Sequence, residues 1–100
     1  MIQQIVAVEE IHHPGSRFYF FRTHAGAEID LIIDRGTERI GVEFKAGVAI
    51  EPRDSVNLRR GIEDGVINRG IVAYHGSRRF EPREGISVIP AEAVLEAPLD

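Results

Sequence analysis

The sequence contains no cysteine and no tryptophan, and only one of its twelve basic residues, Lys45, is a lysine. Without cysteine the chain has no disulfide bond, no thiolate metal ligand and no cysteine nucleophile. It has no apolar run near the ~20 residues that a membrane span needs. Residues 1–4 have neither the basic segment nor the apolar stretch of a secretory signal. We therefore expect a cytoplasmic protein that does not enter a membrane.

The rest of the composition is typical of one globular domain. The chain has 100 residues, of which 43% are hydrophobic and 28% charged, and no repeat or linker divides it. Residues 1–100 are therefore predicted to form a single domain. The net charge of −4 gives no overall basic signature of nucleic-acid binding. Two arginine pairs could still contact a phosphate backbone, although exposed charge beside turns is at least as good an interpretation: Arg59 with Arg60, and Arg78 with Arg79.

Hydrophobic periodicity and turn signals predict an α/β fold, a small mixed β-sheet with flanking helices. For the first segment, a strand is the alternative to a helix, because β-branched residues are frequent there. The elements follow in the order α-β-β-β-α-β-β-α. The predicted helices are 2–11, 53–64 and a last one that begins at Pro90, and the predicted strands are 17–23, 27–34, 39–45, 69–75 and 85–89.

Strands 27–34 and 39–45 are predicted to form a hairpin with a type II′ turn at Gly36 and Thr37, because glycine accepts the positive φ that the first turn position requires. This turn fixes which residues face each other, and alternation assigns them to faces. The apolar residues then share one face: Ile29, Leu31 and Ile33 opposite Phe44, Val42 and Ile40. On the other face Asp30 lies opposite Glu43, and Glu28 opposite Lys45.

Two carboxylates that face each other at ~5 Å are unfavourable in a sheet, and a divalent cation would compensate them. Magnesium is typically held by one or two carboxylates together with water and substrate oxygens. Asp30 and Glu43 would then bind Mg²⁺ or Mn²⁺. Lys45 would orient an attacking water or stabilise charge on a phosphate, and Glu28 would pair with Lys45 or help hold the metal. For so short a motif, an exposed cross-strand ion pair is the alternative.

The motifs together resemble the PD-(D/E)XK nuclease superfamily, which has the restriction-endonuclease-like fold and an α-β-β-β-α-β core. They are most similar to the C-terminal domain of unknown function that is attached to many prokaryotic AAA-type ATPases. The resemblance covers about residues 5–96. It is carried by Gly26-Ala27-Glu28-Ile29-Asp30, by Val42-Glu43-Phe44-Lys45 and by the segment Arg69 to Gly76.

The resemblance implies metal-dependent hydrolysis of nucleic-acid phosphodiesters, with DNA favoured over RNA. Asp30 and Glu43 match the metal-binding acids and Lys45 the catalytic lysine of the superfamily, and Glu9 best matches a glutamate that the first helix often adds. Ile29 stands where the superfamily has its proline.

The sequence has no phosphate-binding loop of an ATPase. The alternative to an enzyme is therefore a non-catalytic nuclease-like interaction module that is the partner of, or a relic from, an AAA-type ATPase. A homodimer is a further option, since the first helix is short.

Overall fold

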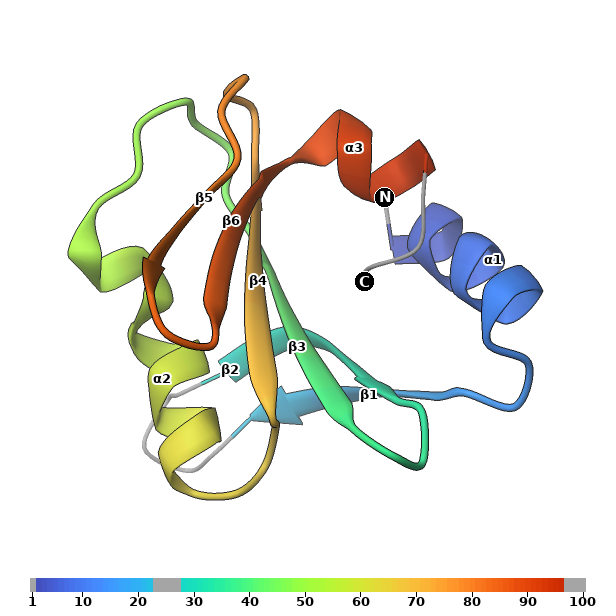
Figure 1. The fold of residues 1–100 in the computed structure, drawn as a ribbon. Coiled ribbons are helices and arrows are strands. Elements are labelled where there is room, and N and C mark those ends of the chain that lie inside the picture. Colours follow the sequence, from blue (N-terminus) through green and yellow to red (C-terminus); the bar gives the residue numbers. More distant parts are fainter. Residues whose placement is uncertain (1, 23–27, 97–100) are drawn as a thin grey trace.

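The computed structural model describes residues 2–22 and 28–96 and shows a mixed sheet of six strands with helices on both faces (Figure 1). The antiparallel strands β1, β2 and β3 form one side of the sheet. The helices are α1 (Ile2–His12), η1 (Pro52–Ser55, a 3-10 turn), α2 (Val56–Glu63) and α3 (Ala91–Glu96); the strands are β1 (Arg17–Arg22), β2 (Glu28–Asp34), β3 (Arg39–Phe44), β4 (Arg69–Tyr74), β5 (Phe80–Arg83) and β6 (Ile86–Pro90).

The strands lie in the order β1-β2-β3-β4-β6-β5. Strands β3, β4 and β6 are parallel, and β5 runs antiparallel to β6 at the edge. Strand β4 is a continuous small and apolar run after Arg69, as is typical of a parallel strand that is covered on both faces. No helix in the described ranges is long and apolar enough to cross a membrane.

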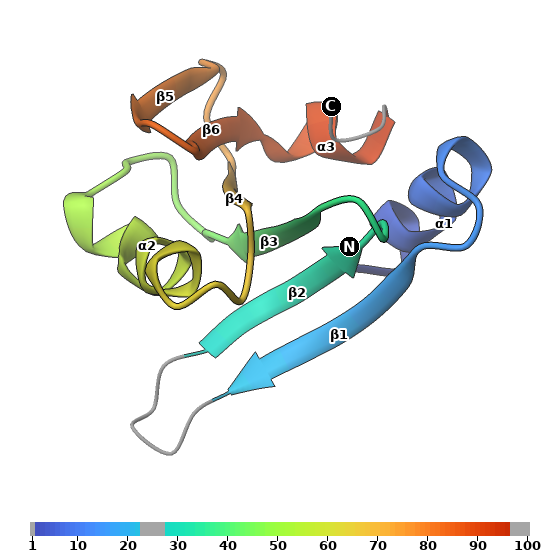
Figure 2. The same ribbon diagram turned by 60° about the horizontal axis from the view of Figure 1, so that its bottom comes forward.

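Each face of the sheet has its own hydrophobic core. Helices α1 and α3 cover one face, where Ile5 and Val94 pack. Helix α2 covers the other face with Leu58, and Figure 2 shows α1 and α2 on opposite sides of the strands. Gly41 allows close packing on this face, because a Cβ there would lie 2.7 Å from Cδ1 of Ile67, after α2, and 3.0 Å from Cδ2 of Leu58, on α2.

Most predicted elements are confirmed within one or two residues, and the differences have local causes. The helix predicted at 53–64 begins as the 3-10 turn η1. Pro90 is the last residue of β6 rather than the first of the final helix. Strand β5 was not predicted, because it contains Pro82; proline is tolerated there since an edge strand leaves one row of N–H groups unpaired.

The predicted position of the turn and its register are confirmed, but the faces predicted for the residues of β2 are partly wrong. Gly36 has φ +86°, and Leu31 and Ile33 face Val42 and Ile40 as expected. Between Tyr19 and Phe21, however, the β1–β2 register shifts by one residue, so that β2 carries one extra residue around position 30. This bulge turns Ile29 to the α2 face, away from Leu31.

Candidate functional site

The bulge in β2 places the Asp30 carboxylate between β2 and β3. Its Oδ2 accepts a hydrogen bond of 2.9 Å from the backbone N–H of Phe44, just beyond the Leu31–Val42 pair where the described β2–β3 ladder ends. Bulges are frequent beside active sites because they redirect a side chain without ending the strand. Here the bulge directs a carboxylate toward the end of β3, the strand that carries Glu43.

Glu43 lies on the α2 face of β3, beside Asp30. Burial, followed by the negative charges of Asp30 and Glu28, raises the pKa of Glu43 from 4.5 to about 8. A hydrogen bond with Asp30 contributes to this rise and favours the protonated form of Glu43. In the described structure, Oε1 of Glu43 is buried and has no hydrogen-bond partner. A proton or a cation is therefore needed between the two acids.

Lys45 follows β3, and its side chain is held by a residue that the sequence analysis did not single out. Its Nζ lies 3.0 Å from Oδ1 of Asp54, in η1. The other oxygen of Asp54 accepts the backbone N–H of Glu51 at 2.7 Å. Burial opposes ionisation of Asp54, but the hydrogen bonds from Glu51 and Lys45 outweigh it and lower its pKa. The lysine is thus fixed by an anion that is itself anchored in the turn before α2.

Glu28 does not pair with Lys45, and that part of the prediction is wrong. Strand β3 ends at Phe44, and Glu28 lies opposite Arg22 on β1. Arg22 donates two hydrogen bonds to Oε2 of Glu28, of 3.1 and 2.9 Å. Glu28 still acts on the site at a distance, because its charge helps to raise the pKa of Glu43.

The structure does not bring Glu9 to the two acids. Its carboxylate is buried under the β2–β3 turn, where Arg35 donates to Oε2 at 2.6 Å and to Oε1 at 2.9 Å. Arg35 lies five residues from Asp30 along β2, which corresponds to about 16 Å of strand. The structure therefore gives Glu9 an ion-pair role at the other end of the hairpin.

The predicted arginines separate into two groups. Arg59, on α2, lines a groove of about 440 Å³ on the α2 face, and the guanidinium of Arg78 lies 5.8 Å from the centre of the Phe80 ring, which lines the same groove. Arg60 and Arg79 are exposed and do not line it. A second cavity, of about 790 Å³, lies at the start of α3 and is lined in part by Arg78.

Two residues that line the groove were missed by sequence reasoning: Asp54 and Arg83. Asp54 had one available signal, since it lies three residues after Glu51 at the start of a helical segment, which is the spacing of a capping box. Its contact with Lys45 spans nine residues of loop and has no local pattern. Arg83 had no signal, because β5 was not recognised.

Among the described residues, no three or more His, Asp or Glu side chains are grouped so that they could hold a metal ion. Asp30 and Glu43 would therefore be the two protein carboxylates of a metal site. Hard divalent cations accept such a set when water and substrate oxygens complete the coordination. The unpartnered Oε1 of Glu43 and the raised pKa of its carboxyl show that the charged form of this group is poorly compensated by the described side chains.

A comparison with family models assigns the chain to a family. The model described as "Domain of unknown function (DUF4143)" matches residues 1–94, so the chain belongs to this family. The match includes both acids, Lys45, Asp54 and the groove.

Two curated mycobacterial proteins are similar in sequence. They are "Uncharacterized protein Mb2031c" of Mycobacterium bovis and "Uncharacterized protein Rv2008c" of Mycobacterium tuberculosis, and each is 29% identical to this chain over 77 residues. Those residues are 77% of this chain but only 17% of each relative. The chain therefore matches less than a fifth of the length of these relatives. No solved structure matches the chain.

Proposed function

We propose that this member of the DUF4143 family is a metal-dependent phosphodiesterase of the PD-(D/E)XK type that cuts nucleic acid, with DNA as the favoured substrate. The observation that carries the proposal is the buried carboxylate oxygen of Glu43, which has no partner among the described residues and belongs to a group beside Asp30. Two neighbouring acids that are withdrawn in part from solvent are costly unless a cation or a proton compensates them. Asp30 and Glu43 are also the two residues that match the metal-binding acids of the superfamily.

The order of elements supports this assignment. The segment from α1 to β4 has the order α-β-β-β-α-β, which is the core order of the superfamily that the motifs resemble. Strands β1 to β3 are antiparallel, and α2 leads to β4, which is parallel to β3. The candidate residues lie on β2 and β3, the two strands that carry the resembling motifs.

A divalent ion bound at Asp30 and Glu43 would polarise a phosphate oxygen and lower the pKa of a bound water, so that hydroxide forms near neutral pH. Mg²⁺ fits two carboxylates with the remaining positions left to water and phosphate, and Mn²⁺ accepts the same oxygen ligands. Both carboxylates belong to strand residues, and that of Asp30 is already held by the backbone N–H of Phe44.

The remaining residues have separate roles in the proposal. Lys45 donates hydrogen bonds from Nζ, either to the attacking water or to a phosphate oxygen that gains negative charge. Asp54 is a positioning residue, because its carboxylate holds Nζ at 3.0 Å before substrate arrives. Glu28 stays outside the ligand set and adds negative potential, which strengthens the attraction for a cation.

A nuclease assay tests the proposal. The full chain is incubated with plasmid and single-stranded DNA in Mg²⁺, in Mn²⁺ and in EDTA. We expect cleavage only with metal, and a loss of at least about a hundredfold in Asp30→Ala, Glu43→Gln and Lys45→Ala. Glu10→Gln, an exposed change of the same kind on α1, is the matched control and should keep full activity. Equal background activity in the wild type and the site variants would rule out the proposed nuclease function.

The second candidate is a non-catalytic interaction module, acting as the partner of, or a relic from, an AAA-type ATPase. Two observations favour it: the net charge of −4 repels nucleic acid, and the matched segment is 17% of each mycobacterial relative, so that in those proteins it accompanies a much longer chain. Calorimetry with Mg²⁺ and Mn²⁺ separates the two candidates. No heat of binding and no thermal shift would favour the interaction module.

A further inference from the structure

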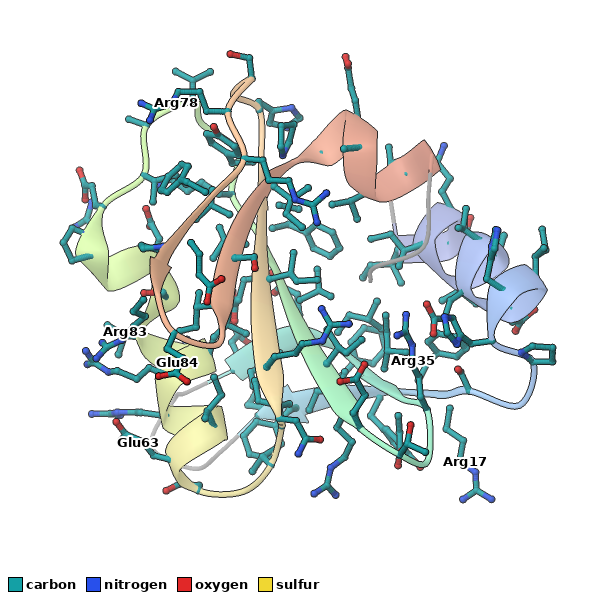
Figure 3. The ribbon with its side chains drawn as sticks, in the orientation of Figure 1. Arg17, Arg35, Glu63, Arg78, Arg83 and Glu84 are labelled. Carbon is teal, nitrogen blue, oxygen red and sulfur yellow. The ribbon has the colours of Figure 1, made fainter. Side chains whose placement is uncertain are left out.

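A groove of about 440 Å³ runs along the α2 face of the sheet, between the segment that leads into α2 and the edge strand β5. One wall comes from Ile50, Pro52 and Arg59, and the other from Pro82 and Arg83. Figure 3 shows Arg83 at the end of β5 that lies near α2, whereas Arg78, which precedes β5, lies away from α2 and does not line the groove. The groove has more apolar than polar lining, and its charged residues lie at its rim.

The floor of the groove leads directly to the candidate metal site. Glu43 on β3 is in register with Val72 on β4, Val72 with Val88 on β6, and Val88 with Phe80 on β5. Residues in register on neighbouring strands point to the same face, with one strand about 4.8 Å from the next. A row of side chains therefore runs from Glu43 across three apolar residues, all of which line the groove or its floor.

The charges around the groove favour an anionic chain. Within the described part of the sequence, neither Arg59 nor Arg83 makes a side-chain hydrogen bond or an ion pair, so both guanidinium groups are available. The acids of the wall are already neutralised: Asp54 is bound by Lys45 at 3.0 Å, and Glu51 by Arg53 at 2.7 Å. Glu84 lies beside Arg83 (Figure 3) but is exposed, so solvent screens its charge.

We propose that this groove binds a single-stranded segment of nucleic acid next to the phosphate that is cut, with an unstacked base on the apolar floor and the backbone on Arg59 and Arg83. The inference rests on the proposed nuclease function and defines its substrate class. Bases in a duplex are stacked inside the helix and cannot reach an apolar floor, whereas unstacked bases pack on aromatic and apolar side chains. A duplex would use only the two arginines.

Binding without metal tests the groove separately from the chemistry. A fluorescein-labelled oligodeoxythymidine of about 12 nucleotides and a duplex of the same length are titrated with the full chain in EDTA, and anisotropy is measured at several salt concentrations. The single strand should bind at least about tenfold more tightly than the duplex. The double variant Arg59→Ala/Arg83→Ala should bind the single strand about tenfold more weakly. It should also reduce the slope of log K against log salt by about 1.4, which is the value for two lost phosphate contacts.

Two further variants connect the effect to the groove. Phe80→Leu keeps an apolar side chain against Tyr74, so the fold is retained, but it removes the aromatic surface and should weaken binding about fivefold. Arg17→Ala is the matched control for charge, because Arg17 is exposed at the start of β1, far from β5 in Figure 3. It should change the affinity by less than about twofold, through net charge alone.

The outcomes separate the groove from the nuclease. Metal-dependent cleavage with equal affinity for single strand and duplex would overturn the groove proposal and leave the nuclease standing. Single-strand binding that depends on Arg59 and Arg83, without cleavage in Mg²⁺ or Mn²⁺, would support the groove and overturn the nuclease. Failure to bind the single strand, or equal losses in Arg17→Ala and in the arginine double variant, would overturn the groove as well.

Discussion

Two groups of acids lie at opposite ends of the β2–β3 hairpin, and they differ in whether the described structure supplies a cation for them. At the turn end, Glu9 is 1% exposed and bound on both oxygens by Arg35, which is 7% exposed. Glu38 completes this cluster with Arg35 and Arg69. At the other end, Asp30 and Glu43 lie beside each other with no cation among the described side chains between them. The first arrangement serves stability, while the second costs stability.

The comparison shows that burial and charge alone do not identify a functional site. The useful criterion is whether the fold supplies a cation for the acid. Hydrogen bonds from Arg69, followed by its charge and that of Arg35, outweigh burial and lower the pKa of Glu38, whereas burial and neighbouring acids raise that of Glu43 to about 8. Both glutamates are partly buried on the same hairpin. What differs is whether the fold supplies a cation, and perturbed groups without a structural cation are candidates for ligand binding.

The largest effect should come from breaking the cluster at the turn. Arg35→Ala leaves the Glu9 carboxylate buried without its two charge-assisted hydrogen bonds, which is expected to cost about 3–5 kcal/mol of unfolding free energy. Urea denaturation at neutral pH measures it. The double variant with Glu9→Ala should recover part of the loss, because the unpaired charge is then gone. A cost below about 1 kcal/mol for Arg35→Ala would show that the cluster is not a stabilising element.

At the acidic pair of Asp30 and Glu43, a substitution is expected to increase the free energy of unfolding rather than to lower it. Glu43 binds a proton more tightly in the folded chain than in the unfolded one, so the folded state loses stability as the pH rises from about 4.5 to about 8. Glu43→Gln removes this loss and should stabilise the apoprotein by about 1 kcal/mol at pH values above 8; solvent access to the half-buried group keeps the gain small. Near pH 4.5 the variant and the wild type should unfold alike. Thermal unfolding across this range checks the prediction, and destabilisation at high pH would contradict it.

The hairpin also shows how far the sequence alone could reach. Gly36 fixed the turn and therefore the register, and the register was enough to bring Asp30 and Glu43 together in the prediction. Strict alternation was then too simple, since it put Ile29 on the wrong face. Ile32 was the available warning, because an apolar residue on the supposedly polar face implies that both faces are covered or that the strand is bulged.

The parts that escaped prediction depend on contacts between distant segments. The partner of Lys45 is Asp54, and only the loop after β3 brings the two within 3.0 Å. Strand β5 pairs with β6 through a turn, and its sequence Phe-Glu-Pro-Arg has no alternation and only one residue that favours strands, Phe80. The candidate site could therefore be predicted at its two acids, but not at the residues that hold its lysine or line its groove.

A third prediction concerns the pH dependence of Mg²⁺ binding at Asp30 and Glu43. Since a bound cation replaces the proton that Glu43 holds below about pH 8, Mg²⁺ affinity should rise about tenfold per pH unit between pH 6 and 7 and level off above the pKa. Titration calorimetry in two buffers with different ionisation enthalpies should detect the release of about one proton at pH 7. Asp30→Asn should abolish the binding, whereas Glu10→Gln should not. Binding that does not depend on pH would mean that the ion does not displace this proton.

The smallest change in unfolding free energy is expected from an arginine–glutamate ion pair at the surface. Arg22 and Glu28 form an arginine–glutamate pair like that of Arg35 and Glu9, but their side chains are 79% and 50% exposed. Arg22→Ala should therefore change the unfolding free energy by about 0.5 kcal/mol or less. It leaves the charge of Glu28 without its partner, however, and that charge contributes to the raised pKa of Glu43. Titration of the Glu43 carboxyl by NMR should show a further rise in its pKa, and a fall would contradict the assigned sign of this coupling.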